Sequence, residues 1–296
     1  MSSENNVVSF SGGKDSTALL LMMLEKGIPV HSAVFFDTGW EFPLMCEHID
    51  RLEKYTGLKI QRVKPKTPFP VLMMEREIVS REVRVEKIGP APPPQELDYD
   101  DGDDFRFDYE CWELDPFEYK KTKIGEVYRI GYGWPSPLRR WCTREKVGAI
   151  DAYIKRIESA VSCIGYAADE AHRTQKKTLQ KKAAAGFKYR FPLIEWGVDE
   201  AAALSICKSH GFDWGGLYEH FHRVSCFCCP LQRIGDLRTL RRHYPLLWET
   251  MLEWDERITL NPGKHNGFKD HVTVRDFEAR FAEEDRFLKL PLAVNE

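Results

Sequence analysis

Short apolar segments alternate with longer amphipathic ones along the first 65 residues of the chain. The segments 7–10, 30–36 and 58–63 are predicted as strands, because they are short, carry apolar side chains and end at turn residues. The stretches 18–24 and 44–56 between them are predicted as helices. Strand–helix–strand order at this spacing predicts a parallel sheet with right-handed crossovers. Ligands of such sheets bind at the carboxyl ends of the strands.

The pattern changes in the middle of the chain and resumes near Leu138. Residues 89–110 combine four prolines with a run of aspartates and glutamates, and we predict a solvated loop there, with an acidic metal site as the alternative. Residues from there through Trp134 receive no assignment. The remaining predicted elements are a helix over 139–157, a strand over 160–166, a strand end at 191–196, and helices over 198–210, 234–242 and 245–257.

Composition is that of a globular protein. Of the 296 residues, 43% are hydrophobic and 12% aromatic. No apolar run reaches the roughly 18 residues that a membrane-spanning helix needs, and the first residues, MSSENN, form no basic or apolar leader. We therefore expect a cytoplasmic protein with no membrane contact. The net charge of −3 gives no overall attraction for nucleic acid, so such binding would use local patches.

The densest candidate chemistry follows the first predicted strand. The sequence Ser11-Gly12-Gly13-Lys14-Asp15-Ser16-Thr17 joins that strand to the first helix. Glycines let the backbone turn sharply and approach a ligand, and the helix N-terminus offers free N–H groups and a positive dipole end. Hydroxyl groups and the Lys14 cation add donors, so we predict a site for the pyrophosphate of a nucleotide. The spacing fits neither a Walker loop nor a dinucleotide fingerprint, and an ordinary glycine turn is the alternative.

This loop resembles the PP-loop of the ATP pyrophosphatases, in the version found in the PAPS reductase family. The resemblance implies an adenine nucleotide: either ATP, cleaved between its α and β phosphates, or an already adenylated sulfur compound. It implies that Ser11 to Thr17 bind the nucleotide and that Lys14 and Asp15 take part in catalysis. Asp37-Thr38-Gly39, at the end of the second strand, also resembles that family and implies an adenosine site. A turn closed by the Asp37 side chain is the alternative.

The segment from Gly165 to Arg173 resembles a second motif of the family, which lies on the phosphate side of the nucleotide site. Arg173 would clamp phosphate oxygens, and Asp169 or Glu170 would hold Mg²⁺. An acidic helix start with a solvated arginine is the alternative. The basic run 176–190 that follows is a lid, a nucleic-acid contact or a solvated loop.

Eight cysteines in a cytosolic chain point to metal or redox chemistry rather than structural disulfides. Cys226 and Cys229 have the Cys-x-x-Cys spacing that lets two thiolates share one metal centre. Cys142 is the third candidate, because a helix N-terminus lowers the pKa of a thiol. The other cysteines, apart from Cys228, lie in apolar contexts and are predicted to be buried hydrophobes: Cys46, Cys111, Cys163 and Cys207.

The arrangement of these cysteines resembles PP-loop proteins that carry a 4Fe-4S cluster, including DNA phosphorothioation enzymes and assimilatory sulfonucleotide reductases. The implied ligands are Cys142, Cys226, Cys228 and Cys229, with His222 as the alternative fourth ligand because Cys228 and Cys229 are adjacent. A tetrahedral zinc site and free thiols stay open as alternatives. Together the resemblances cover most of the chain and imply an α/β fold, a Rossmann-like parallel sheet with helices on both faces. Residues 1–205 would form this domain, with an insertion at about 89–135, and residues 206–296 a mostly helical cap carrying the cysteines.

Three functions are consistent with these motifs. The first is an ATP-dependent adenylating enzyme of sulfur transfer with an iron–sulfur cluster, acting on DNA, RNA or a small molecule and supplied by a cysteine-desulfurase-like donor. The second is a PAPS or APS reductase, against which stand the lack of any cysteine after Cys229 and Trp141-Cys142 in place of a Cys-Cys pair. The third is a nucleotide-binding module with structural zinc.

Two further segments are candidates for binding. Residues 211–223 mix glycines, aromatics and cations, and we predict the core of the cap there, with base stacking as the alternative. A basic helix face is the best local candidate for a nucleic-acid surface; it comprises Arg233, Arg238, Arg241, Arg242 and His243.

Overall fold

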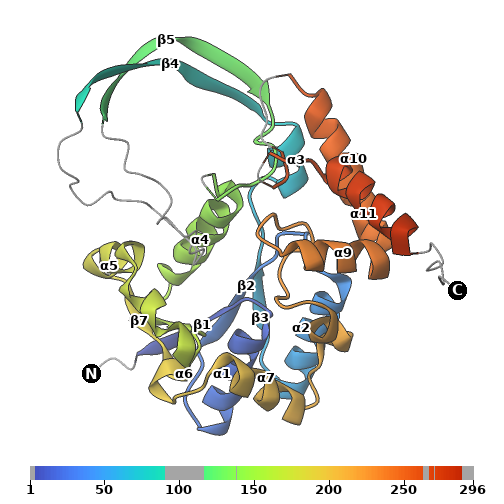
Figure 1. The fold of residues 1–296 in the computed structure, drawn as a ribbon. Coiled ribbons are helices and arrows are strands. Elements are labelled where there is room, and N and C mark those ends of the chain that lie inside the picture. Colours follow the sequence, from blue (N-terminus) through green and yellow to red (C-terminus); the bar gives the residue numbers. More distant parts are fainter. Residues whose placement is uncertain (1–3, 91–116, 138, 263–266, 270, 289–296) are drawn as a thin grey trace, which may run out of the picture.

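A five-stranded parallel sheet forms the centre of the protein, in the order β3-β2-β1-β6-β7. The computed structural model describes residues 4–90, 117–137, 139–262, 267–269 and 271–288 (Figure 1). The strands are β1 (Asn5–Phe10), β2 (Ser32–Phe36), β3 (Ile60–Val63), β6 (Ala160–Ile164) and β7 (Lys188–Arg190). On the central strand, Val8 pairs with Ala33 on one side and Cys163 on the other, and all three are fully buried. Strands covered on both faces read as continuous apolar runs, which is why the sequence predicted them.

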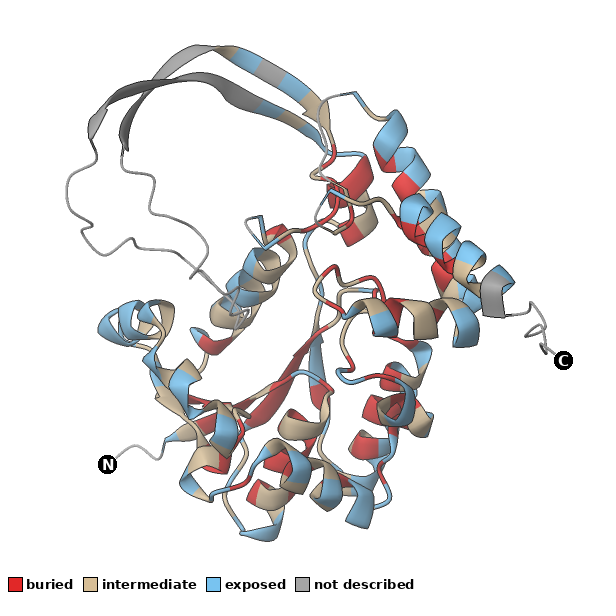
Figure 2. Ribbon diagram, in the orientation of Figure 1, coloured by how far each residue is buried: buried red, intermediate tan, exposed pale blue. Residues whose placement is uncertain are grey.

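Helices cover both faces of this sheet. Figure 1 shows α1 (Lys14–Glu25), α2 (Pro43–Thr56) and α7 (Glu200–Ser209) on one side and α4 (Trp141–Ile154) on the other. Buried residues concentrate on the sheet and on the helix faces turned toward it, while the outer faces are exposed (Figure 2). The predicted Rossmann-like α/β fold is therefore confirmed.

The strand order reverses beside β1. From β1 the chain moves outward to β2 and β3, whereas β6 and β7 lie on the opposite side of β1. Loops that leave neighbouring strands in opposite directions open a crevice at the carboxyl ends, where open α/β sheets bind ligands. The loop after β1 begins at Ser11, and the segment after β6 begins at Gly165, so both phosphate motifs lie at this crevice.

A long antiparallel hairpin, absent from the sequence predictions, arches away from the sheet at the top of Figure 1. It consists of β4 (Glu77–Pro90) and β5 (Phe117–Ile130), and it follows the short helix α3 (Phe69–Met74). Its base is tightly fixed, since the N–H of Gly131 donates to Arg76 O at 2.8 Å. The acidic stretch predicted as a solvated loop lies almost entirely outside the described residues.

The C-terminal part is helical, as predicted, and joins the same core. It contains a 3-10 turn η3 (Trp214–Gly216) and the helices α8 (Leu217–His220), α9 (Ile234–His243), α10 (Pro245–Leu260) and α11 (Val274–Leu288). One continuous cluster of buried side chains runs from β1 and α1 into α9 and α11. The buried residues Phe212 and Trp214 confirm the predicted cap core. No helix in the described ranges is long and apolar enough to cross a bilayer.

Between β6 and α7 the chain forms η2 (Ala168–Gln175), α5 (Lys177–Ala184) and α6 (Pro192–Glu195). The strand end predicted at 191–196 is wrong: the strand β7 stops at Arg190 and a short helix follows. Proline at the first helical position explains the change, because its fixed φ suits a helix start and it has no N–H for a ladder. The basic run 176–190 forms α5 and β7 rather than a loop.

The basic face predicted on α9 is largely neutralised by α11. Arg238 pairs with Glu284 at 2.6 Å, and Arg241 pairs with Glu278 at 2.7 Å and Asp285 at 2.6 Å. Arg242 also reaches Asp285, at 2.9 Å. These arginines therefore join two helices, and the face they were predicted to form does not stand as an open cationic surface.

Candidate nucleotide and cysteine site

The glycine turn after β1 is held by its own serines. Ser16 Oγ accepts from the Ser11 N–H at 3.1 Å, lies 3.1 Å from Ser11 Oγ, and donates to Gly13 O at 3.1 Å. Gly12 has a φ of +81°, in the left-handed region that glycine adopts without strain. The turn delivers the chain into α1, whose first amides are not needed for helix bonds.

Lys14 lies between two carboxylates at the mouth of this turn. Its Nζ donates to Asp15 at 3.2 Å and to Glu200 Oε2 at 2.6 Å. Burial alone would lower the pKa of Lys14, but Glu200 and Asp15 outweigh it and the pKa is raised. Burial raises the pKa of Asp15, and Lys14 opposes that shift. Glu200 begins α7, and no local signal in the sequence marks it as part of the loop site.

Thr17 faces the core rather than the open side of the turn. It is fully buried, and its hydroxyl lies 3.1 Å from His48 Nε2. Burial lowers the pKa of His48 to about 3, so its ring is neutral. The ring stacks on Trp214 at 4.3 Å, and Trp214 Nε1 donates to Gly12 O at 2.7 Å. Thr17 thus connects the loop to the cap through aromatic packing.

The second phosphate motif packs directly against the loop. A side chain at Gly165 would lie 3.0 Å from Asp15 O, which explains the need for glycine there. The charge of Glu170 acts on Asp15, and Arg173 Nη1 donates to both carboxylate oxygens of Glu170 at 2.9 Å. The structure therefore places Gly165, Glu170 and Arg173 beside the loop, whereas Asp169 is exposed.

The Asp37 motif leads from the sheet edge to the cysteines. Asp37 Oδ1 accepts from the Gly39 N–H at 3.0 Å, which closes the turn at the end of β2. Thr38 Oγ1 donates to Glu41 Oε1 at 2.7 Å and lies 3.7 Å from Cys226 Sγ. Residues 41 and 226 form an isolated antiparallel bridge. One side of the predicted adenosine site is thus in contact with the predicted metal site.

The four predicted cysteine ligands gather here from two parts of the chain. Cys142 lies in the first turn of α4, and Cys226, Cys228 and Cys229 lie in a turn closed by Cys229 N donating to Cys226 O at 3.2 Å. Burial raises the pKa of Cys226 and of Cys228, and the charges that act on each include those of Cys229 and Cys142. Within the described residues, no group of three His, Cys, Asp or Glu side chains forms a ready cradle for a metal ion.

The chemistry around these thiols suits a positively charged centre. The charges that act most strongly on Cys226 come from acids: Glu41, Cys229 and Cys142. Buried polar atoms without a hydrogen-bond partner surround the turn, namely Glu41 Oε2, Trp40 Nε1 and Gln232 Oε1. Gln232 itself donates to Cys226 O at 3.0 Å, and Trp40 O accepts from the Phe227 N–H at 2.9 Å. Buried acids and unpaired acceptor oxygens at one place fit a metal or cluster that would compensate them.

The other cysteines differ in how far they are buried. Cys163 and Cys207 are fully buried, as predicted, and Cys207 Sγ donates to Lys14 O at 3.3 Å. Cys46 is exposed on α2, so the prediction of a buried position was wrong; the amphipathic helix turns that residue outward. Cys111 lies outside the described residues. His222, the alternative ligand, is exposed.

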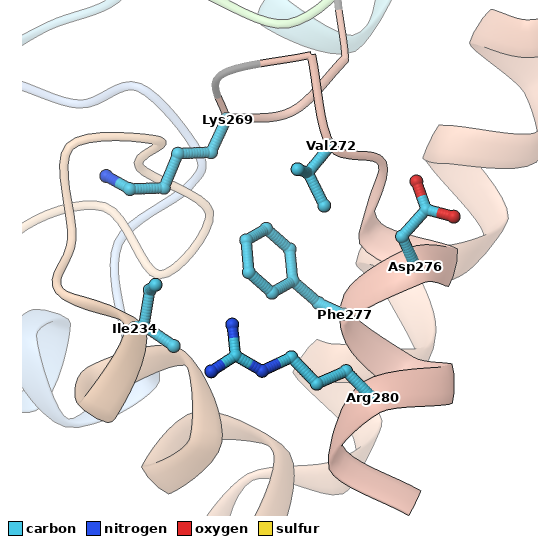
Figure 3. Close-up of a pocket in the computed structure, with 6 residues that line it drawn as sticks. All are labelled: Ile234, Lys269, Val272, Asp276, Phe277 and Arg280. Carbon is cyan, nitrogen blue, oxygen red and sulfur yellow. The ribbon is translucent and has the colours of Figure 1, made fainter. Parts of the chain in front are cut away.

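A separate hollow of about 310 Å³ lies between the start of α9 and α11 (Figure 3). Phe277 and Val272 face its centre, while the Lys269 amine turns away toward the loop before Ile234. That amine donates to Pro230 O at 3.0 Å. None of the predicted site residues lines the hollow. Its Lys269 amine holds the residue that follows the cysteine turn, Pro230.

Comparison with known proteins agrees with the motifs. Residues 5–82 match the model of the phosphoadenosine phosphosulfate reductase domain. The family predicted from the sequence is confirmed over that segment. An uncharacterized protein of Methanocaldococcus jannaschii is 24% identical over 88% of this chain, and the chain spans only 42% of that protein's length. An uncharacterized 37.8 kDa protein of Escherichia phage 186 is 25% identical over 86% of this chain and 75% of its own.

One solved structure aligns with this chain over the chain's whole length. It is the U34-tRNA thiolase NcsA of Methanococcus maripaludis with its [4Fe-4S] cluster, at 14% identity and a TM-score of 0.38, and 76% of that chain is covered.

Proposed function

We propose that the protein is an ATP-dependent enzyme of sulfur transfer that cleaves ATP between the α and β phosphates. The observation that carries the proposal is the meeting of three motifs at one sheet edge. The phosphate loop packs against Gly165 and lies within electrostatic range of Glu170, and the Asp37 turn touches Cys226 through Thr38. A nucleotide bound across that edge would have its phosphates on the loop and its adenosine near Asp37 to Gly39, beside the cysteines.

The charged groups have distinct roles in this proposal. Lys14 and Arg173 would stabilise negative charge on the leaving pyrophosphate, and each such donor is typically worth ~2.7–4 kcal/mol of barrier. Asp169 or Glu170 would hold Mg²⁺ against the phosphate oxygens, with Asp15 beside them. Because Lys14 and Arg173 pair with carboxylates in this structure, the nucleotide would exchange those partners for its own oxygens.

Cys142, Cys226, Cys228 and Cys229 are the residues that would hold a 4Fe-4S cluster, or zinc if the site is structural. When bound, a cluster supplies a site for sulfide, which an adenylated acceptor needs as its nucleophile. The cysteines and Glu41 would keep that site buried, since Cys228 is 1% exposed and the Glu41 oxygen Oε2 is enclosed.

The acceptor and the donor belong to the same proposal. A nucleic acid is the favoured acceptor, because residues 139–190 carry a marked excess of positive charge beside the site, and a small molecule is the alternative. A cysteine-desulfurase-like protein would supply the sulfur. The domain match also favours one second candidate, a PAPS or APS reductase.

The decisive experiment measures products. Anaerobically purified protein with ATP and Mg²⁺ should release AMP and pyrophosphate, with and without added RNA or DNA. Lys14→Ala should abolish this release while the protein stays folded. The control Lys59→Ala, which removes an exposed lysine just before β3, should leave it unchanged. Release of ADP and phosphate instead would refute α–β cleavage. Sulfite formed from PAPS with a thiol donor would establish the reductase.

A further inference from the structure

The cap places two side chains directly on the phosphate loop. Trp214 Nε1 donates to Gly12 O at 2.7 Å, and the Tyr218 hydroxyl accepts from the Lys14 N–H at 2.9 Å. Trp214 is buried and meets Tyr218 edge to face at 4.8 Å. The two residues come from η3 and α8, about 200 positions along the chain from the loop.

The Tyr218 contact uses a group that a phosphate needs. Lys14 is the first residue of α1, and its amide is one of the free N–H groups that a helix offers to an anion. That N–H has one hydrogen to give, and the hydroxyl oxygen holds it. A side chain on Gly13 would come within 3.3 Å of the same oxygen, so the space above the turn is already filled.

Three other donors of the loop are also held by protein groups. Ser11 and Ser16 bond to each other inside the turn, whereas Lys14 Nζ is held from outside by Glu200 at 2.6 Å. Tyr218 and Glu200 belong to α8 and α7, and they occupy the Lys14 N–H and the Lys14 amine. A nucleotide bound to the loop would therefore displace these two contacts.

We propose that Tyr218 is a latch on the nucleotide site, whose hydroxyl leaves the Lys14 amide when the pyrophosphate of the nucleotide binds. The proposal rests on the proposed function only in that a nucleotide binds this loop. A phosphate is the stronger acceptor, since it is charged and burial keeps the Tyr218 hydroxyl protonated by raising its pKa. Tyr218 precedes Cys226 by eight residues, so the latch and the cysteines belong to one stretch of the cap.

The test compares nucleotide affinity in three forms of the full-length protein. Wild type, Tyr218→Phe and the control Tyr244→Phe are titrated calorimetrically with Mg²⁺ and α,β-methylene-ATP, which is not cleaved between the α and β phosphates. Tyr244 packs against Phe42 and Phe221 in the same cap and does not touch the loop. Tyr218→Phe should bind roughly two- to tenfold tighter, the worth of one hydrogen bond that no longer has to be exchanged, and Tyr244→Phe should match wild type.

The outcomes separate cleanly. Equal affinity of wild type and Tyr218→Phe overturns the latch and leaves the proposed function standing. Binding weakened tenfold in Tyr218→Phe also overturns it, because the hydroxyl would then be a ligand of the nucleotide. If neither form binds the analogue, the proposed function and the latch both fall. A second measurement guards against misfolding: with 3-fluorotyrosine incorporated, the ¹⁹F signal that Tyr218→Phe removes should shift on adding the nucleotide, and a fixed signal contradicts the latch.

Discussion

Cys142 and Cys229 lie in different parts of the chain, but the charge of each raises the pKa of the same two thiols, those of Cys226 and Cys228. If the four hold one centre, removing either should release it. We therefore expect Cys142→Ala and Cys229→Ala each to lose most bound iron or zinc, measured by metal analysis and visible absorbance after anaerobic purification.

The matched control for that experiment is Cys46→Ala. Cys46 is exposed on α2 and is not one of the four candidate ligands, so its loss should leave metal content unchanged. Full metal retention in Cys142→Ala would remove that residue from the ligand set.

Gly131 is the residue at the base of the hairpin where a side chain cannot be placed. Its φ is +76°, and an added Cβ would lie 2.1 Å from Met73 O, a backbone atom that cannot move aside cheaply. Gly131→Ala should lower the free energy of unfolding by about 3 kcal/mol or more, measured by urea denaturation. Gly27→Ala isolates the backbone strain, since Gly27 has a φ of +65° and open space around it, and should cost only about 1 kcal/mol. Equal costs would mean that the contact with Met73 is not the cause.

The pairing of α9 with α11 depends on Glu278. This carboxylate accepts from Arg241 at 2.7 and 2.9 Å and from Trp248 Nε1 at 2.7 Å. The Arg241 hydrogen bond lowers the pKa of Glu278, so the folded state favours the charged form. A lowered pKa contributes stability above the unfolded value, and that contribution is lost as pH falls through the folded value.

We accordingly expect Glu278→Gln to reduce the free energy of unfolding by about 1 kcal/mol at pH 7, because the pair is partly exposed. The difference from wild type should vanish in acid, below the pKa of the folded carboxyl. Thermal melts across the acid range measure it. Glu256→Gln, which breaks the exposed pair with Arg275, serves as the control and should change little. A deficit for Glu278→Gln that persists undiminished in acid would contradict the electrostatic account.

Among the elements, the sequence predicted those whose signal is local. The strands around β1 are mostly apolar, and α2 begins at a proline and ends just before Gly57, both of which are visible in the sequence. The hairpin was missed because β5 is rich in lysine and lacks a continuous apolar run. A two-stranded ribbon needs no such run, so its pattern resembles a polar loop. Likewise α11 was missed because its charges face α9, a partner that only the folded chain reveals.

The site was predictable in its motifs and not in its contacts. Ser11 to Thr17 and the cysteines are short local patterns that can be read directly in the sequence. Glu200 and Tyr218 reach the loop only through the fold, since no spacing links them to Lys14. Glu41 lies two residues beyond the Asp37-Thr38-Gly39 motif, and the position of its carboxylate near Cys226 follows only from the folded structure.

Charge is divided unevenly over the whole molecule. Residues 139–190 contain 13 Lys and Arg against 5 Asp and Glu, which gives +8, so the rest of the chain carries −11 of the total of −3. In Figure 1 the elements of this segment, including α4, α5 and β7, lie together on one side of the sheet. Such a division is typical of proteins that hold a polyanion at one place.

From this division we expect RNA or DNA binding that weakens steeply with salt, with a slope of about −0.9 in log affinity against log salt for each phosphate contacted in duplex DNA. Lys177→Glu and Lys181→Glu, both on α5, should each weaken binding and reduce the slope, measured by filter binding over a salt series. Lys54→Glu, on the exposed side of α2, should do neither. Affinity that does not change with salt concentration, or an equal loss of affinity in all three variants, would contradict a nucleic-acid site here and favour a small-molecule acceptor.

The bond from Trp214 to Gly12 has a consequence for how the chain acquires its shape. The two residues are 202 positions apart in the chain. The turn after the first strand therefore gains this hydrogen bond only after the cap has been synthesised and has folded against it. Contacts of such long range are formed late and slow the search for the native state. A fragment ending after the matched segment 5–82 would therefore lack the clamp on its glycine turn, and binding measured on such a fragment would describe a different, looser loop.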